Sequence, residues 1–164
     1  MFVVGGEEAA DDGAKRLIQS TYDSWVQSMN LVRPDVDYNV IGKAGSRMGT
    51  GTMIILDDQT CPVGMVLNLI RFFAHESCGF CTPCRDGLPW TRQVLEDIEQ
   101  GRGKTEDLDT LEYQINYIGA IGNTHCALAP GAMEPLQSAL KYFRDDFERH
   151  ISGGCCPYHS RKGA

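Results

Sequence analysis

The sequence lacks an apolar run near the roughly 20 residues that a membrane-spanning helix needs, and it lacks an excess of positive charge. Its 15 basic residues stand against 22 acidic ones, which gives a formal net charge of −7. Nucleic-acid-binding proteins draw much of their affinity from basic side chains. We therefore expect no nucleic-acid partner, and no attraction to an anionic membrane surface.

The sequence also lacks a recognisable leader and a recognisable hydrolytic motif. Residues 1–15, MFVVGGEEAADDGAK, contain neither a basic leader nor a long apolar core, so we expect no signal peptide and a cytoplasmic location. No Ser–His–Asp set appears. The glycine-rich residues 42–51 precede a short apolar run and do not match the P-loop, in which Gly-Lys-Ser/Thr opens a helix.

The apolar pattern predicts a mainly α protein. Residues 1–35 are expected to form a flexible N-terminus with one amphipathic helix over 14–29, and a short strand is expected at 52–58. Four further helices with short connections predict an antiparallel four-helix bundle over residues 60–152, followed by a tail, 153–164. These helices span residues 60–76 with Thr60 as N-cap, 89–100 with Trp90 facing inward, 105–118 capped by Thr105, and 131–150.

Three cysteines lie three residues apart, at Cys78, Cys81 and Cys84. Three consecutive thiolates at this spacing can bind a cuboidal [4Fe–4S] cluster from one side, and such a cluster takes four cysteine ligands. Gly79 would let main-chain N–H groups approach the sulfur atoms, and Pro83 is expected to stiffen the loop and keep Thr82 extended.

The best candidate for the fourth ligand is Cys126. It follows two predicted helices that would return the chain to the same end of the bundle, and it directly precedes the last helix. The alternative is a structural four-cysteine zinc module used for subunit assembly. Zinc sites of that kind usually consist of two separate CxxC pairs, whereas here the pairs overlap. A third explanation is that the cysteines are incidental and bind no common metal ion or cluster.

The remaining cysteines carry weaker signals. Cys61 is expected to be a buried or half-buried free thiol. Cys155 and Cys156 are expected to be two exposed thiols in a flexible tail, in preference to a small metal site with His159. The two histidines that flank the cysteine motifs, His75 and His125, could each hydrogen-bond near a cluster.

Three stretches of the sequence resemble a known family. They are IGKAGSRMGTGTMIILDD, FFAHESCGFCTPCRDGLPW and CALAPGAMEPLQSALKYFRDDFE. Together they resemble the C-terminal part of the flavin-bearing, NADH-binding subunit of respiratory complex I, an NADH:quinone oxidoreductase. The resemblance runs from about Leu31 to Ile151, and the ESCG-x-CTPCR-x-G signature within it is highly specific.

The resemblance implies a [4Fe–4S] cluster on Cys78, Cys81, Cys84 and Cys126. It implies that the chain relays single electrons from a reduced flavin mononucleotide (FMN) in a flavoprotein to a neighbouring iron–sulfur subunit. It also implies that residues 36–59 are the remnant of a ubiquitin-like, soluble-ligand-binding β-grasp domain. A location on the cytoplasmic face of the inner membrane, through a larger complex, would follow.

The flavin and NADH sites of the family lie in a large N-terminal domain that has no counterpart here. We therefore expect FMN and NAD to bind only a partner or a missing domain, and the chain alone not to oxidise NADH. A truncated or split gene product, an excerpted domain and a stand-alone adaptor all remain open.

Overall fold

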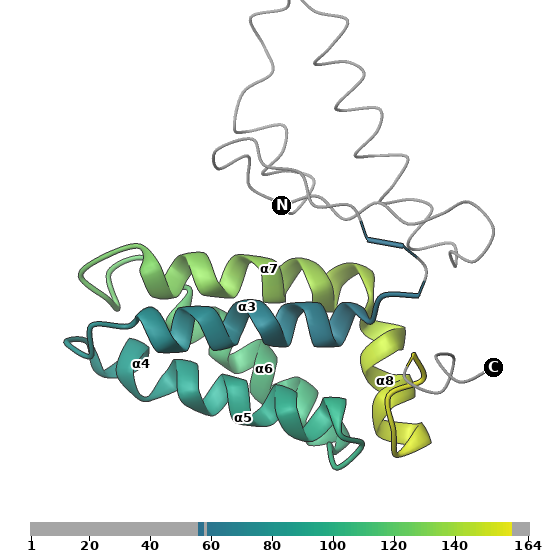
Figure 1. Cartoon of the computed structure of the whole chain (residues 1–164). Helices are drawn as coiled ribbons and strands as arrows, with labels where there is room; N and C mark the ends of the chain where they lie inside the picture. Colours follow the sequence, from purple (N-terminus) through teal and green to yellow (C-terminus); the bar gives the residue numbers. More distant parts are fainter. Residues whose placement is uncertain (1–55, 58, 159–164) are drawn as a thin grey trace, which may run out of the picture. The chain divides into compact units, whose positions relative to one another are not determined.

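The computed structural model describes residues 56–57 and 59–158 (Figure 1). The helix expected at 14–29 and the ubiquitin-like remnant at 36–59 therefore lie outside the described residues, apart from a few positions without regular structure. Within the described part the chain is helical and forms no strand. In chain order its helices are α3 (Pro62–Glu76), α4 (Thr82–Arg85), α5 (Gly87–Glu99), α6 (Thr105–Ile118), α7 (Leu128–Tyr142) and α8 (Arg144–Gly153).

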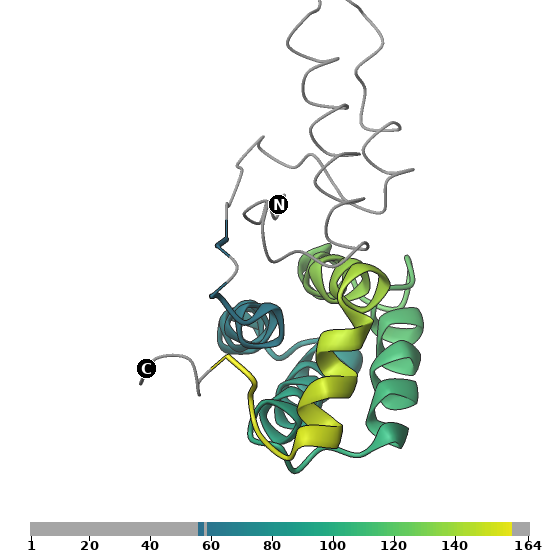
Figure 2. The ribbon, with the colours of Figure 1, turned by 90° about the vertical axis from the view of Figure 1, so that its right-hand side faces the viewer.

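Four of these helices form an up-and-down bundle. α3 packs against α5 and α7, and α6 packs against the same two helices from the other side. Successive long helices run in opposite directions along the bundle, and α8 crosses one of its ends (Figures 1 and 2). The short connections predicted from the sequence force this antiparallel order, because neighbouring helices in the chain must meet end to end.

The core of the bundle is built from apolar stripes at helical spacing. Residues on α3, α5, α6 and α7 meet there, and burying each large aliphatic side chain contributes roughly 1.5–3 kcal/mol. Helical spacing in the sequence predicts inward positions such as Ile70, Leu95, Leu111 and Leu136, and these are confirmed. The large, fully buried apolar side chains include Ile70, Leu88, Leu95, Ile98, Leu108, Leu111, Ile118, Met133, Leu136 and Phe147.

Two predicted helix starts are wrong by one residue. α3 is capped by Cys61, not Thr60, and the Cys61 Sγ accepts a hydrogen bond from the Gly64 N–H at 3.2 Å. The reason is Pro62, which keeps the preceding residue extended and so makes it the cap. α6 is capped by Lys104, whose own N–H donates to the Asp107 Oδ2 at 2.7 Å.

Two expectations about side chains are also wrong. Trp90 is 52% exposed, because α5 begins at Gly87 and its buried stripe follows Leu88, Thr91, Leu95 and Ile98. Thr82 is not extended. It is the first residue of α4, with Pro83 in the first turn, where the missing proline N–H costs no hydrogen bond.

The helix predicted over 131–150 is in fact two helices. The chain turns at Phe143 between α7 and α8, where the Asp146 N–H donates to the Phe143 carbonyl at 2.9 Å. Asp145 and Asp146 then occupy the first turn of α8, where negative charge is favourable. The turn directs α8 across the end of the bundle (Figure 2). Phe147 and His150 of α8 are completely buried.

None of the helices in the described part of the chain is long and apolar enough to cross a membrane.

Candidate functional site

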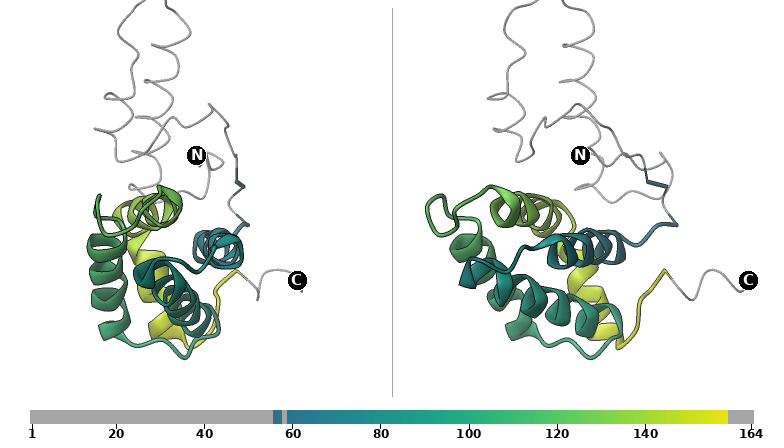
Figure 3. Two further views of the ribbon diagram at one scale, coloured as in Figure 1. Left: turned by 90° about the vertical axis from the view of Figure 1, so that its left-hand side faces the viewer. Right: turned by 60° about the vertical axis from the view of Figure 1, so that its left-hand side comes forward.

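The four cysteines predicted as ligands lie in two segments at one end of the bundle. Cys78 and Cys81 lie between α3 and α4, and Cys84 lies in α4. Cys126 lies in the connection between α6 and α7, and both segments lie at the end of the bundle where α3 finishes (Figures 1 and 3). Cys84 is buried, Cys81 is half-buried, and Cys78 and Cys126 are exposed.

The two segments touch each other directly. The main-chain N–H of His125 donates to the Sγ of Cys81 over 3.4 Å, although 44 positions separate the two residues. The ring of His125 also packs edge-on against the ring of Phe80, with 5.2 Å between the centroids. The structure thus brings the residue next to Cys126 against the segment that carries Cys78, Cys81 and Cys84, which we call the three-cysteine loop.

Polar groups surround the buried thiol of this loop. The Ser77 hydroxyl lies 3.1 Å from the Cys84 Sγ and accepts a hydrogen bond from the Gly79 N–H at 3.3 Å, so it can donate its own proton to the sulfur when Cys84 is a thiolate. Gly79 has a φ of +77°, a left-handed conformation that side-chain-bearing residues rarely adopt. The Arg85 guanidinium donates to the Gly79 carbonyl at 3.2 Å and so spans the loop.

These residues fit an iron–sulfur cluster. The donor set is four thiols, and N–H and O–H donors already point at two of the sulfurs, as hydrogen bonds to cluster ligands do. The Ser77 hydroxyl was not predicted, and His125, which was expected to hydrogen-bond near a cluster, does so through its main-chain N–H and not its ring. The second histidine, His75, is exposed, and its ring pairs with the neighbouring Glu76 at 2.9 Å and not with a cysteine.

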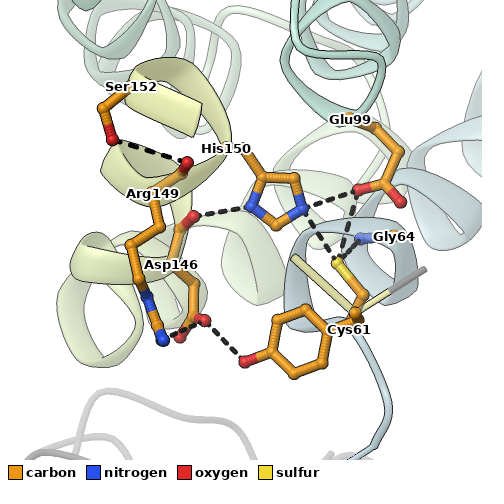
Figure 4. A network of polar contacts seen from close by, with 8 residues as sticks. Cys61, Gly64, Glu99, Asp146, Arg149, His150 and Ser152 are labelled. Atoms are coloured by element: carbon orange, nitrogen blue, oxygen red, sulfur yellow. Dashed lines mark hydrogen bonds and ion pairs between the residues drawn. The ribbon is translucent and has the colours of Figure 1, made fainter. Parts of the chain in front are cut away.

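A second group of ligand-type side chains, which we call the α8 site, lies at the opposite end of the bundle. His150 Nε2 lies 3.2 Å from both the Cys61 Sγ and the Glu99 Oε2, and the Cys61 Sγ lies 3.3 Å from the same carboxylate oxygen (Figure 4). The ligand atoms of all its members lie within 4.8 Å of one another. The α8 site consists of Cys61, Glu99, His150 and Cys156.

Cys156 corrects the expectation of two exposed thiols in the tail. Cys155 is exposed, but Cys156 is buried, with 4% of its surface accessible. Gly154 adopts a left-handed conformation (φ +62°) directly after α8 and turns the chain back toward the bundle. Sequence spacing gave no signal for this site, because its members are spread from position 61 to position 156.

Burial and hydrogen bonding set the electrostatics of the α8 site. Burial raises the pKa of the Cys61 thiol, although the Gly64 N–H lowers it in part. Burial alone would also raise the pKa of the Glu99 carboxyl, but hydrogen bonds from His150, Cys156 and Cys61 bring it below its ordinary value. The Glu99 carboxylate is therefore the shared hydrogen-bond acceptor of the other three side chains in the site.

A helical bundle with a CxxCxxC loop that contacts the segment carrying a further cysteine is typical of iron–sulfur-binding domains. The family model described as the NADH-ubiquinone oxidoreductase-F iron-sulfur binding region matches residues 64–150. The chain belongs to this family, and family membership implies a [4Fe–4S] cluster.

Curated relatives and a solved structure agree with this assignment. The chain is 53% identical over 116 residues to the NADH-quinone oxidoreductase F subunit of Escherichia coli, covering 71% of this chain and 26% of the relative. It is 48% identical over 124 residues to the F 2 subunit of the Rhizobium meliloti enzyme of the same name, covering 76% and 29%. The chain thus spans about a quarter of the length of these relatives.

One solved structure that the chain matches is an NAD+-reducing [NiFe]-hydrogenase in its H2-reduced state. It has a TM-score of 0.52 and 32% sequence identity, and it covers 63% of this chain and 17% of that one.

Proposed function

We propose that this chain is an electron-transfer module of an NADH:quinone oxidoreductase-like complex, in which Cys78, Cys81, Cys84 and Cys126 hold one [4Fe–4S] cluster. The observation that carries the proposal is the hydrogen bond from the His125 N–H to the Cys81 Sγ. This contact holds the segment of the fourth cysteine against the three-cysteine loop. A bound cluster of this type accepts and donates one electron at a time.

The protein's own residues prepare the site for that role. The burial of Cys84 keeps water from one side, and the Ser77 hydroxyl and the His125 N–H donate toward thiolate sulfur. Hydrogen bonds to sulfur favour the reduced, more negative state, so these donors raise the reduction potential. The exposure of Cys78 and Cys126 leaves another side of the site open to a partner.

We propose that the partners are a flavoprotein, which carries FMN and the NADH site, and a second iron–sulfur protein of the complex. Two side chains support a protein contact at this end of the bundle. Phe80 is 74% exposed in the three-cysteine loop, and Ile121 is 99% exposed in the connection that leads to Cys126. Large apolar side chains exposed beside a site are typical of interaction surfaces. A position on the cytoplasmic face of the membrane, reached only through the larger complex, belongs to the same proposal.

The test is to measure iron, acid-labile sulfide and zinc in anaerobically purified full-length chain, with EPR spectra before and after dithionite. We expect about four irons and four sulfides per chain, and a fast-relaxing EPR signal that appears only on reduction. Zinc without labile sulfide, retained after iron-replete expression and lost in Cys84→Ser, would instead establish a structural zinc module on the same four cysteines.

A further inference from the structure

The α8 site gathers its ligand groups from four separate parts of the bundle. Cys61 caps the start of α3, Glu99 is the last residue of α5, His150 lies in α8, and Cys156 follows α8. Figure 4 shows Cys61, Glu99 and His150 pointing toward one another. His150 and Cys156 are buried, and Cys61 and Glu99 are half-buried. Such a convergence of thiol, imidazole and carboxylate is unusual in an otherwise apolar interior.

The spacing of the atoms fits a tetrahedral ion. Zinc binds sulfur at about 2.3 Å and nitrogen or oxygen at about 2.0–2.2 Å, so its tetrahedral ligands lie about 3.3–3.8 Å from one another. The three separations among Cys61 Sγ, Glu99 Oε2 and His150 Nε2 are 3.2–3.3 Å. The Cys156 Sγ lies within 4.8 Å of all three atoms, so only a small adjustment would complete the tetrahedron.

His150 presents the correct nitrogen. Its Nδ1 lies 2.6 Å from the main-chain carbonyl of Asp146, so Nδ1 carries the proton and donates it. A zinc ion would bind the neutral ring through Nε2, the nitrogen that faces Cys61 and Glu99. A metal-binding histidine is usually oriented in this way, by a hydrogen bond from its other nitrogen to a carbonyl or a carboxylate.

The surroundings hold the other groups in place. The Gly64 N–H at the start of α3 donates to the Cys61 Sγ and so helps to fix the position of this sulfur. Asp146, whose carbonyl orients His150, is itself fixed by the Tyr158 hydroxyl and the Arg149 guanidinium, each 2.6 Å from its Oδ1. The outer contacts of a structural metal site are therefore present before any ion binds.

We propose that the α8 site binds one zinc ion in a closed, four-coordinate structural site. The donor set of two cysteines, one histidine and one glutamate consists of ligands that zinc takes in proteins. The ion would link α8 and the segment after it to the start of α3 and the end of α5. α3 alone, with 15 residues, puts about 22 Å between this end and the three-cysteine loop, so the proposal is independent of the iron–sulfur site.

The first test measures zinc and iron in the same sample of cluster-loaded, full-length chain. We expect one zinc per chain beside the iron. Cys156→Ser should remove the zinc and leave the iron, whereas Cys84→Ser should do the reverse. Cys155→Ser is the matched control, because it changes the neighbouring, exposed thiol and should leave both metals bound.

The second test measures affinity. Chelator competition should show that Cys156→Ser and Glu99→Gln each weaken zinc binding by roughly 100-fold or more, because even outer-shell partners are worth about 10–100-fold. Glu99→Gln keeps the size of the side chain and removes its charge, so it covers the case in which Cys156→Ser fails to fold. Titration with Co2+ should give the visible bands of a tetrahedral thiolate site in the wild type and Cys155→Ser, and weaker bands in Cys156→Ser.

Three results would overturn the proposal. The first is a cluster-loaded wild-type chain that takes up no zinc when zinc is supplied. The second is zinc binding that Cys156→Ser and Cys155→Ser affect equally. The third is a disulfide between Cys61 and Cys156 in anaerobically purified protein. The two sulfurs would then be bonded to each other and could not bind zinc as thiolates.

Discussion

The main-chain N–H of His125 hydrogen-bonds to the Sγ of Cys81, so two segments that are 44 positions apart in the sequence meet at one sulfur atom. This contact places the connection between α6 and α7 on the three-cysteine loop. Cys126, the proposed fourth ligand, is the residue next to this contact in the sequence.

The first prediction concerns that fourth ligand. Cys126→Ser should lower the iron content below four per chain, or convert the cluster to a three-iron form, because one iron loses its thiolate. Iron analysis and EPR of anaerobically purified protein measure this. Cys155→Ser changes another exposed thiol, at the opposite end of the bundle, and should leave the cluster intact. If the two variants behave alike, Cys126 is not the ligand.

The second prediction concerns the hydroxyl beside Cys84. Ser77→Ala removes a donor 3.1 Å from the sulfur, so the reduced cluster loses stabilisation and the midpoint potential should fall. The expected shift is on the order of tens of millivolts, since a hydrogen bond is worth about 1 kcal/mol and a tenfold change in a one-electron equilibrium is about 59 mV. A redox titration followed by EPR measures it.

The control for this shift is Ser152→Ala, which removes a serine hydroxyl near the α8 site that donates to the Arg149 carbonyl. An unchanged potential in Ser77→Ala, or an equal fall in both variants, would mean that the Ser77 hydroxyl does not act on the cluster.

The third prediction concerns the close approach of two turns. Gly101 has a φ of +71°, and a Cβ at this position would collide with the main chain of Gly154. Gly122 also has a positive φ, +99°, but a Cβ there would meet nothing within 4 Å. Gly122→Ala should cost about 1–2 kcal/mol for its conformation alone. Gly101→Ala should cost at least about 1 kcal/mol more, because main-chain atoms must move.

Urea unfolding of the two glycine variants, at equal cluster loading, provides the comparison. Equal free energies of unfolding would show that the two turns do not touch in solution.

The fourth prediction separates the two faces of α5. Leu95 is fully buried, whereas Trp90 is half-exposed. Leu95→Ala should lower the free energy of unfolding by about 2–5 kcal/mol, since it leaves a cavity in the core. Trp90→Ala should cost about 1 kcal/mol or less despite removing a larger side chain. The reverse order in urea unfolding would restore the original expectation that Trp90 faces inward.

The sequence alone was enough to predict the helical class, most of the buried stripes and the three-cysteine loop. These features depend on short-range patterns: helical periodicity places residues such as Leu108 and Leu111 on one face, and a spacing of three residues keeps Cys78, Cys81 and Cys84 in one loop. The family resemblance rested on the same local motifs, and the family comparison confirmed it.

Tertiary structure decided what local patterns cannot encode. The turn at Phe143 exists because it lets α8 bury Phe147 and His150 across the end of the bundle. The apolar pattern of residues 131–150 continues through this position, so it does not predict the turn. The α8 site arises in the same way. Cys61, Glu99 and Cys156 lie far apart in the sequence, and each by itself is an ordinary residue near a helix end. Only the packing of α3, α5 and α8 brings their ligand atoms within 4.8 Å of one another.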